Sequence, residues 1–244
     1  MPRSPLPAPL SWPGLNALRL PSLCALCHGW GPQRVCPACV KRWAGAAFRC
    51  ARCAIGTPTA TAQCGACVLN PPPYAGAVAA FDYATPWDGL IARFKFNEAL
   101  DLVPSMTQQL LCAIRATGVT LPELLLPVPL SESRLRERGY NQAWEIARRL
   151  GKALALRADA HLLLRTKDTP HQLALPPSAR AANVRGAFAV EPLRLREVRG
   201  KHVALIDDVL TTGATAAEIS RTLLRAGAAA VQIWVLARTP RPNS

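Results

Sequence analysis

Residues 203–218 read VALIDDVLTTGATAAE. An apolar run that suits a buried strand leads directly into two adjacent carboxylates, Asp207 and Asp208, and then into a helix start. At that start Gly213 permits close backbone approach, and the first helical turn offers unpaired N–H groups. The other residues of this loop are Thr211, Thr212, Ala214 and Thr215. We interpret residues 211–215 as a cradle for a phosphate monoester.

The paired carboxylates narrow the class of ligand. Asp207 and Asp208 would repel an isolated anion, so they must face sugar hydroxyls, a divalent cation or developing positive charge. A phosphorylated sugar meets these conditions. The alternative is an ordinary strand-to-helix turn with a threonine cap and solvated aspartates. A Walker-type nucleotide loop is excluded because the sequence contains no Gly-x-x-x-x-Gly-Lys-Ser/Thr pattern.

Outside this stretch, apolar segments with strand and helix periods alternate along the chain. Strands are predicted at 77–83, 124–129, 161–165, 203–207 and 231–237, and helices at 88–96, 100–117, 141–154 and 216–227. This alternation predicts an α/β fold whose parallel sheet has helices on both faces. Ligands of such sheets bind beyond the carboxyl ends of the strands.

Composition and net charge exclude some classes of protein and indicate the kind of partner. Of the 244 residues, 50% are hydrophobic and 18% are charged, which excludes wholesale disorder and collagen-like repeats. The net charge is +14, and residues 1–70 hold seven basic residues and no acidic one. A basic balance favours anionic partners such as phosphates or nucleic acid. The alternative is that the charge serves only to keep the protein in solution.

Eight of the nine cysteines form four Cys-x-x-Cys pairs. The pairs are Cys24/Cys27, Cys36/Cys39, Cys50/Cys53 and Cys64/Cys67. Two such pairs complete a tetrahedral Zn²⁺ site, and four sulfur ligands leave no position for a catalytic water. We therefore predict two structural zinc ions. Sequential pairing of neighbouring pairs is favoured over interleaved pairing because it closes shorter loops.

Proline-rich stretches divide the chain into predicted parts. Residues 1–20 form a Pro-rich tail, 21–70 a double zinc ribbon and 74–239 the α/β domain. The ninth cysteine, Cys112, falls in an apolar helix and is predicted to lie in the core. No run reaches the roughly 18 apolar residues that span a bilayer. Because proline also interrupts the first residues, we expect a cytoplasmic protein without membrane insertion, in which cysteines bind metal rather than form disulfides.

The motif IDDVLTTGAT resembles the 5-phosphoribosyl-1-pyrophosphate (PRPP) signature of type I phosphoribosyltransferases. More narrowly, the chain is similar from Cys24 to Arg238 to the ComF/GntX family of competence-related and gluconate-utilisation proteins. The features that carry this similarity are the four cysteine pairs, FKF (94–96), PVPL (127–130), RLRERGYNQA (134–143), the 172–183 stretch with VRGAF (184–188), and the signature itself.

The resemblance implies a type I phosphoribosyltransferase-like fold that binds PRPP with Mg²⁺. Asp207 and Asp208 would be the catalytic residues, which hold the ribose hydroxyls and stabilise positive charge on the ring. The implied PRPP contacts are Thr211, Thr212, Gly213, Ala214 and Thr215 for the 5-phosphate, Arg134 and Arg138 for the pyrophosphate, and Gln172 and Arg180 in a flexible loop at 166–185. The alternative for residues 166–185 is a plain surface loop.

The roles of Arg136 and Lys95, and the peptide conformation before Pro127 and Pro129, stay open at this point. Arg136 is another candidate for the pyrophosphate, or a solvated residue paired with a neighbouring glutamate. Lys95 is either an anion contact or an ordinary lysine on a helix surface. A cis peptide bond, which pyrophosphate loops often contain, would cost little before Pro127 or Pro129.

The sequence thus predicts an enzyme that transfers the phosphoribosyl group of PRPP to an unidentified acceptor and releases pyrophosphate. The resemblance links this activity to DNA uptake and natural transformation. The alternative is a PRPP sensor or adaptor without turnover, whose basic zinc ribbons bind single-stranded DNA or a DNA-uptake helicase. Both hypotheses stay open because no residue stands out as a base for the acceptor.

Overall fold

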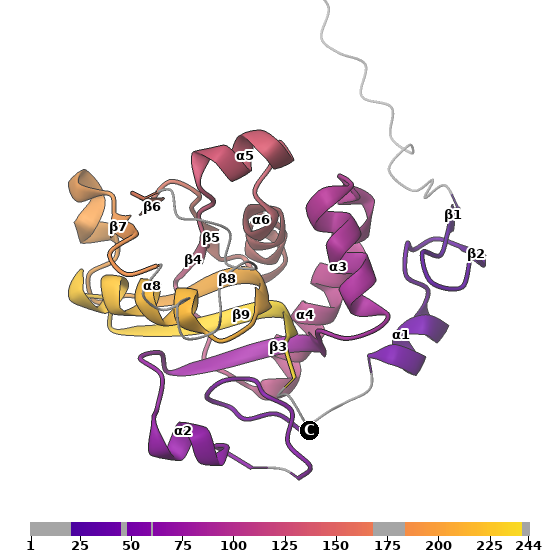
Figure 1. The fold of residues 1–244 in the computed structure, drawn as a ribbon, viewed down its shortest axis with the longest axis horizontal. Helices are drawn as coiled ribbons and strands as arrows, with labels where there is room; N and C mark the ends of the chain where they lie inside the picture. Colours follow the sequence, from indigo (N-terminus) through magenta and orange to yellow (C-terminus); the bar gives the residue numbers. More distant parts are fainter. Residues whose placement is uncertain (1–20, 45–47, 60, 168–183, 241–244) are drawn as a thin grey trace, which may run out of the picture.

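The computed structural model describes residues 21–44, 48–59, 61–167 and 184–240. The predicted tail at 1–20 lies outside these residues. Figure 1 shows a central sheet with helices packed on it, and two small cysteine-rich segments beside the sheet and its helices. The expected α/β architecture is therefore present.

The central sheet has five parallel strands in the order β3, β9, β8, β4, β5 (Figure 1). They are β3 (Gly76–Asp82), β9 (Ala230–Arg238), β8 (His202–Leu210), β4 (Leu124–Pro127) and β5 (Arg157–Ala158). The long strands β8 and β9 lie at the centre, where both faces are covered, which explains their nearly continuous apolar sequences. The last strand of the chain, β9, is inserted between β3 and β8.

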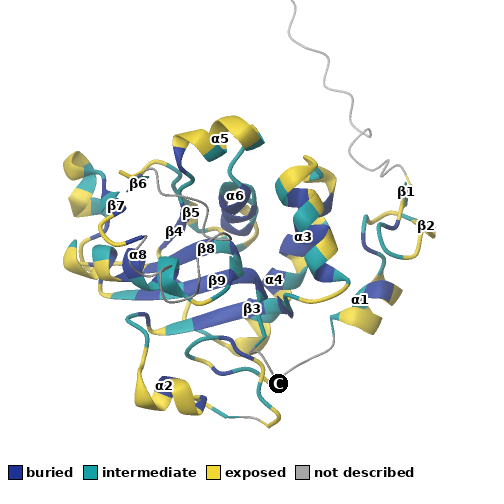
Figure 2. Ribbon diagram, viewed as in Figure 1, coloured by how far each residue is buried: buried dark blue, intermediate teal, exposed yellow. Residues whose placement is uncertain are grey.

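Helices cover both faces of this sheet. They are α3 (Trp87–Phe96), α4 (Val103–Thr117), α6 (Gln142–Leu154) and α8 (Ala214–Arg225). Because side chains alternate along a strand, Leu205 faces the core that α8 covers, whereas Ile206 faces the core that α3, α4 and α6 cover. The buried colour of the central strands in Figure 2 reflects this double cover. The predicted parallel sheet with helices on both faces is confirmed.

Short elements account for most differences from the sequence prediction. The strand predicted at 161–165 is β6 (Leu163–Arg165), which lies outside the central sheet and pairs antiparallel with β7 (Phe188–Val190). Strands of two or three residues, such as β5 and β7, carry too little periodicity to be predicted. A short helix, α5 (Glu132–Arg138), follows β4. Short 3-10 helices occur at Leu100–Leu102 (η2) and Pro192–Glu197 (η4).

Two expectations from the sequence concern single positions. The prediction that Cys112 lies in the core is wrong, because this residue is exposed on the solvent face of α4. The structure has a cis peptide bond at Thr85–Pro86, and the bonds before Pro127 and Pro129 are trans.

The eight paired cysteines gather into two groups. The first four-cysteine group is Cys24, Cys27, Cys36 and Cys39, and the second is Cys50, Cys53, Cys64 and Cys67. Sequential pairing is therefore correct. The first group is carried by β1 (Ser22–Leu23), β2 (Trp30–Gly31) and α1 (Pro37–Trp43), and the second group ends in α2 (Gly65–Leu69). In Figure 1, α1 lies near α3, whereas α2 lies on the other side of β3.

Within the described residues, every helix is too short or too polar to cross a bilayer.

Gly151, near the end of α6, provides a test of the packing. A Cβ atom there would lie 2.8 Å from the Leu156 carbonyl oxygen and 3.2 Å from the Ala158 Cβ, whereas at Gly89 in α3 nothing lies within 4 Å. Alanine in place of glycine normally stabilises a helix by about 0.5–1 kcal/mol, but overpacking costs about 1–3 kcal/mol. We expect Gly151→Ala to lower the free energy of unfolding in urea by about 1–3 kcal/mol, and Gly89→Ala to raise it slightly. Equal effects of the two substitutions would contradict this packing.

Candidate functional site

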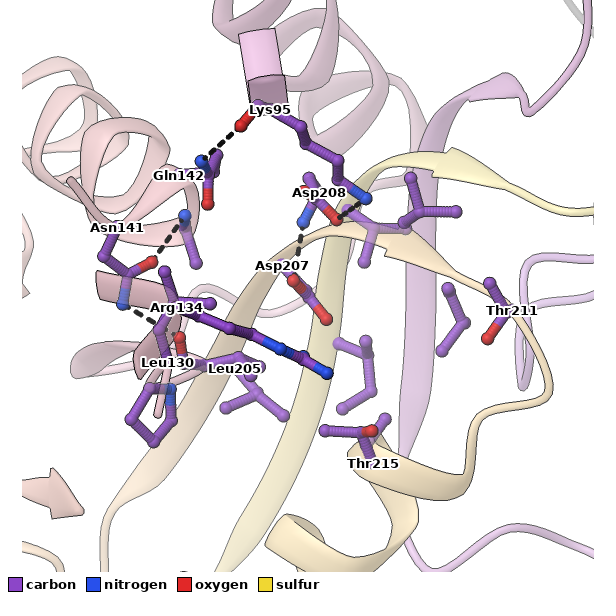
Figure 3. A pocket seen from close by; sticks show the side chains of 18 of the residues that line it. Lys95, Leu130, Arg134, Asn141, Gln142, Leu205, Asp207, Asp208, Thr211 and Thr215 are labelled. Carbon is purple, nitrogen blue, oxygen red and sulfur yellow. Dashed lines mark hydrogen bonds and ion pairs between the residues drawn. The ribbon is translucent and has the colours of Figure 1, made fainter. Parts of the chain in front are cut away.

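A cavity of about 220 Å³ opens at the carboxyl ends of β4 and β8. Its lining comes from Tyr83 after β3, the end of α3, the segment from β4 to the start of α6, β6, β8, the start of α8 and β9. Figure 3 shows labelled side chains from α3, the segment between β4 and α6, β8 and the start of α8 converging on one space. The charged and polar residues that line it are Lys95, Arg134, Arg138, Asn141, Gln142, Arg165, Asp207, Asp208, Thr211 and Thr215.

Asp207 and Asp208 belong to the strand itself. The sequence suggested that the strand ends at residue 207, but β8 continues to Leu210 because β9 pairs with it over that length. Successive strand residues point to opposite faces, so Asp208 is directed toward α3 and Asp207 toward the other side of the cavity. The Asp208 N–H donates a hydrogen bond of 2.9 Å to Asp207 Oδ1. The two carboxylates therefore share the cavity without stacking on each other.

Lys95, at the end of α3, balances part of this negative charge. Its Nζ lies 2.9 Å from Asp208 Oδ1, and the two side chains are 19% and 10% exposed. Figure 3 shows the lysine reaching down to Asp208 from the helix. The sequence left the role of Lys95 open, and the structure places it in the site. The FKF motif (94–96) marked Lys95 in the sequence, but its partner Asp208 follows only from the packing of α3.

Asp207 is the titratable group most affected by this environment. Burial and the neighbouring Asp208 carboxylate raise the pKa of Asp207 to about 7. Lys95 and Arg138 oppose this shift, but they do not cancel it. The carboxyl of Asp207 can therefore exchange a proton near neutral pH.

The 211–215 loop turns β8 into α8. Gly213 precedes α8 in the left-handed conformation, with φ of 83°, which glycine adopts without strain. The Thr212 hydroxyl accepts a hydrogen bond of 3.4 Å from the Ala214 N–H. Thr211 and Thr215 line the cavity, and Figure 3 shows both beside it. The first turn of α8 thus directs its positive end toward the acidic pair.

The arginine wall lies opposite the loop, on α5. Arg134 and Arg138 line the cavity, and Figure 3 shows Arg134 extended toward the space between Asp207 and Thr215. Arg136 does not join them, because its side chain is 76% exposed and lies 3.8 Å from Glu132. Among the described residues, the buried Arg138 Nε has no hydrogen-bond partner. The described residues therefore leave one donor of Arg138 unsatisfied.

Two polar residues hold α5 and its arginines in position. Neither residue was singled out from the sequence. Asn141 caps α6 by accepting hydrogen bonds from Ala143 N and Trp144 N, and it donates one of 3.0 Å to the Val128 carbonyl. Gln142 is buried, accepts a bond of 3.1 Å from Arg138 Nη1 and donates one of 3.5 Å to the Lys95 carbonyl. Gln142 thus connects the cations on α3 and α5.

Arg165 of β6 also lines the cavity, with its guanidinium 5.5 Å from the centre of the Phe188 ring. Sequence reasoning predicted a strand here but missed Arg165, because it did not show that β6 leaves the central sheet and pairs with β7. The predicted contacts Gln172 and Arg180 lie outside the described residues.

The sulfur atoms of each four-cysteine group lie within 4.8 Å of one another, so each group could hold a metal ion. A regular tetrahedron with Zn–S bonds of about 2.3 Å has edges of about 3.8 Å. The measured separations are 3.7 Å for Cys27 and Cys36 and 3.8 Å for Cys53 and Cys64. The donor set and the spacing therefore fit structural zinc.

The fold and the site define an α/β protein with a cavity at the carboxyl edge of a parallel sheet and two four-cysteine groups. The predicted phosphoribosyltransferase-like fold class with an N-terminal double zinc ribbon agrees with this description. The chain is 35% identical over 229 residues to "DNA utilization protein YhgH" of Escherichia coli K12, covering 91% of this chain and 99% of that protein. It is 33% identical over 208 residues to "Competence protein F" of Haemophilus influenzae, covering 84% and 90%.

The chain belongs to the ComF family. "Competence protein ComFC" of Bacillus subtilis is 28% identical over 160 residues, which cover 61% of this chain and 58% of that protein. Among solved structures, glutamine phosphoribosylpyrophosphate amidotransferase from B. subtilis is 19% identical, with a TM-score of 0.35, over 55% of this chain and 25% of that chain. No family model matches the chain.

The raised pKa of Asp207 predicts a pH-dependent stability. Between its ordinary value of 3.8 and about 7, Asp207 binds a proton in the folded chain but not in the unfolded one. Protonation of Asp207 therefore raises the free energy of unfolding at low pH, and this contribution disappears as pH rises toward 7. We expect Asp207→Asn to match the wild type near pH 4 and to be more stable at pH 8 by about 1–3 kcal/mol in urea unfolding, since one pKa unit corresponds to about 1.4 kcal/mol.

Asp208→Asn is the matched control for this measurement. It removes the neighbouring charge but keeps Asp207. The fall in the free energy of unfolding with rising pH should therefore remain, but it should occur at lower pH. Parallel pH profiles for the wild type and Asp207→Asn would show that Asp207 is not perturbed.

Proposed function

We propose that the cavity binds PRPP with Mg²⁺ and that the protein transfers the phosphoribosyl group to an acceptor, releasing pyrophosphate. The observation that carries this proposal is the meeting of three features in one cavity. A helix start at the 211–215 loop suits a phosphate, two carboxylates at the end of β8 suit a ribose, and arginines on α5 suit a second phosphate group. This order of charges matches the order of groups in PRPP.

Each group has a proposed role. The N–H groups and hydroxyls of Thr211, Thr212, Gly213, Ala214 and Thr215 hold the 5-phosphate. Asp207 and Asp208 accept hydrogen bonds from the ribose hydroxyls, and Arg134 and Arg138 bind pyrophosphate oxygens. Arg138 lines the cavity, and Gln142 holds its guanidinium in place.

The same residues would favour the reaction. A lone pair of the acceptor forms a bond to the anomeric carbon, and the electrons of the carbon–oxygen bond leave with pyrophosphate. Positive charge develops on the ribose ring, where the carboxylates of Asp207 and Asp208 stabilise it. Carboxylate and phosphate oxygens are ligands that Mg²⁺ prefers, and the ion when bound neutralises the leaving pyrophosphate.

Zinc is the proposed occupant of both four-cysteine groups, because each offers four sulfur ligands at tetrahedral spacing. Its role is structural, since metal binding would stabilise a segment with few large apolar residues. A cytoplasmic setting is proposed with it, because thiolates stay reduced there.

Binding of PRPP tests the proposal directly. We expect calorimetric titration of PRPP with Mg²⁺ to show binding, and Arg138→Gln to weaken it about tenfold or more, because a hydrogen bond to a charged group contributes about 1.5–3 kcal/mol. Arg136→Gln is the matched control on the same helix and should leave the affinity within about twofold, because Arg136 faces solvent. An equal loss of PRPP affinity in both variants would contradict the assignment of Arg138 to the pyrophosphate.

Pyrophosphate release then separates the enzyme from the alternative. Release with a panel of bases and amines supports transfer, whereas tight binding of PRPP without release with every acceptor supports a sensor. Heats of binding at pH 7 in buffers of different ionisation enthalpy should show proton release, because the cation lowers the raised pKa of Asp207.

A second candidate function is binding of single-stranded DNA by the first four-cysteine group. Trp30 of β2 is 74% exposed, and Lys41 and Arg42 at the end of α1 are exposed on the same group. An exposed aromatic ring and exposed cations on one small segment suit base stacking along a phosphate backbone. The names of two relatives, "DNA utilization protein" and "Competence protein F", agree with such a role. A DNA-uptake helicase is the other partner that this surface would serve.

For the DNA function, we expect Trp30→Ala to weaken binding of a labelled oligothymidylate about tenfold in fluorescence anisotropy, since stacking contributes about 1–3 kcal/mol per base. Affinity should also fall as salt rises. The control Leu193→Ala removes an apolar side chain that is even more exposed, at 93%, from η4 and should have no effect. Salt-independent binding would exclude the phosphate contacts.

A further inference from the structure

Arg238, the last residue of β9, connects the candidate site with the second four-cysteine group. Its Nη1 donates hydrogen bonds to the Leu210 carbonyl at 2.8 Å, to the Thr211 carbonyl and to the Thr239 carbonyl at 3.0 Å. Its Nε donates a hydrogen bond of 3.0 Å to the carbonyl of Cys53. One half-buried guanidinium thus holds the start of the 211–215 loop and the backbone of a metal-ligand residue.

A second contact joins the same two regions. Tyr74 follows the second four-cysteine group in the chain and is 4% exposed. Its hydroxyl oxygen lies 3.4 Å from the position that a Cβ atom would take on Gly213. The turn of the loop therefore rests on a side chain next to the cysteine group.

The second four-cysteine group is itself fixed on the sheet. Arg49 Nη1 donates to Asp82 Oδ1 at 2.7 Å and to the Ala54 carbonyl at 3.2 Å. The Ala77 N–H donates to the Ala51 carbonyl at 2.9 Å. Ala54 is fully buried in the core that α8 covers. The backbone of Cys53 therefore has a defined position relative to β3 and β9.

The first four-cysteine group is attached elsewhere. Trp87 Nε1 of α3 donates to the Trp43 carbonyl at 2.8 Å, and Arg34 pairs with Asp101 of η2. Cys24 and Cys39 join the core that α3 and α4 cover. This group thus offers a natural comparison, with the same ligands and spacing but a different attachment.

We propose that the second four-cysteine group positions the 211–215 loop through Arg238, so that metal in this group and a sugar phosphate in the cavity stabilise each other's binding. The metal fixes the backbone of Cys53, the Cys53 carbonyl fixes the guanidinium, and the guanidinium fixes the carbonyls at the start of the loop. Coupling between two sites is reciprocal, so the ligand must also strengthen metal binding. Arg238 is a positioning residue, and the identity of the ligand rests on the proposed function.

Hydrogen exchange in the full chain tests the positioning without any ligand. We compare amide exchange of residues 209–216 in zinc-loaded wild type, Cys53→Ser, Cys27→Ser, Arg238→Lys and Arg34→Lys. Cys53→Ser and Arg238→Lys should each speed exchange about fivefold or more, whereas Cys27→Ser and Arg34→Lys, which alter only the first four-cysteine group and its attachment, should not. Arg238→Lys keeps the charge but removes the planar guanidinium, whose Nε and Nη1 reach the Cys53 and Leu210 carbonyls separately.

Zinc retention tests the coupling. In wild type, saturating ribose 5-phosphate should slow zinc loss from the second group to a chelator about fivefold, and this protection should disappear in Arg238→Lys while zinc content stays at that of wild type. A merely structural role of Arg238 would lower stability without removing the protection. Unchanged exchange in Arg238→Lys and Cys53→Ser, or equal acceleration in Cys27→Ser, would overturn the inference.

The proposed function can fail separately. If neither ribose 5-phosphate nor PRPP binds but the exchange of residues 209–216 follows the second four-cysteine group alone, the positioning stands and the PRPP assignment falls. If both ligands bind and Arg238→Lys neither speeds exchange nor changes zinc protection, the PRPP assignment stands and the positioning falls.

Discussion

Two adjacent carboxylates at the end of a strand, with neighbouring strands on both sides, impose the main electrostatic constraint on this molecule. Asp208 is 10% exposed as a side chain, and burying such a charge without a partner costs several kcal/mol. The partner is Lys95, which α3 carries across the top of the sheet. Asp207 has no such direct ion pair among the described residues, and burial together with the Asp208 carboxylate raises its pKa. The unequal surroundings of the two acids follow from the alternation of side chains along β8.

The cations around this pair are held in place before any ligand arrives. Gln142 connects Arg138 to the backbone at Lys95, and Asn141 ties the start of α6 to the chain after β4. Donors that are already oriented lose little conformational freedom when an anion binds. Their hydrogen bonds can therefore stabilise the bound ligand or the transition state at a small cost in entropy. The polar network of the wall therefore contributes to the site without touching the ligand.

Local patterns predict the parts of the site that lie together in sequence. The acidic pair, the glycine turn and the start of α8 could all be predicted from residues 203–218, and the cysteine spacing predicts both four-cysteine groups. Lys95 and Arg238 could not be assigned in this way. Their roles depend on where α3 packs and on the insertion of β9 between β3 and β8, which only the pairing of distant strands establishes. Cys112 shows the opposite error, since an apolar helix still has a solvent face.

The two four-cysteine groups illustrate how attachment, rather than ligand pattern, gives a metal site its influence. Both have the same Cys-x-x-Cys pairs and similar sulfur separations. A closed tetrahedral site has no chemistry of its own to offer, so it can affect a distant cavity only through the backbone that it fixes. The first group fixes backbone that meets α3 and η2, whereas the second fixes the Cys53 carbonyl that Arg238 shares with the 211–215 loop. Only in the second group, among the described residues, do hydrogen bonds through Arg238 connect the backbone of a cysteine ligand to the loop at the cavity.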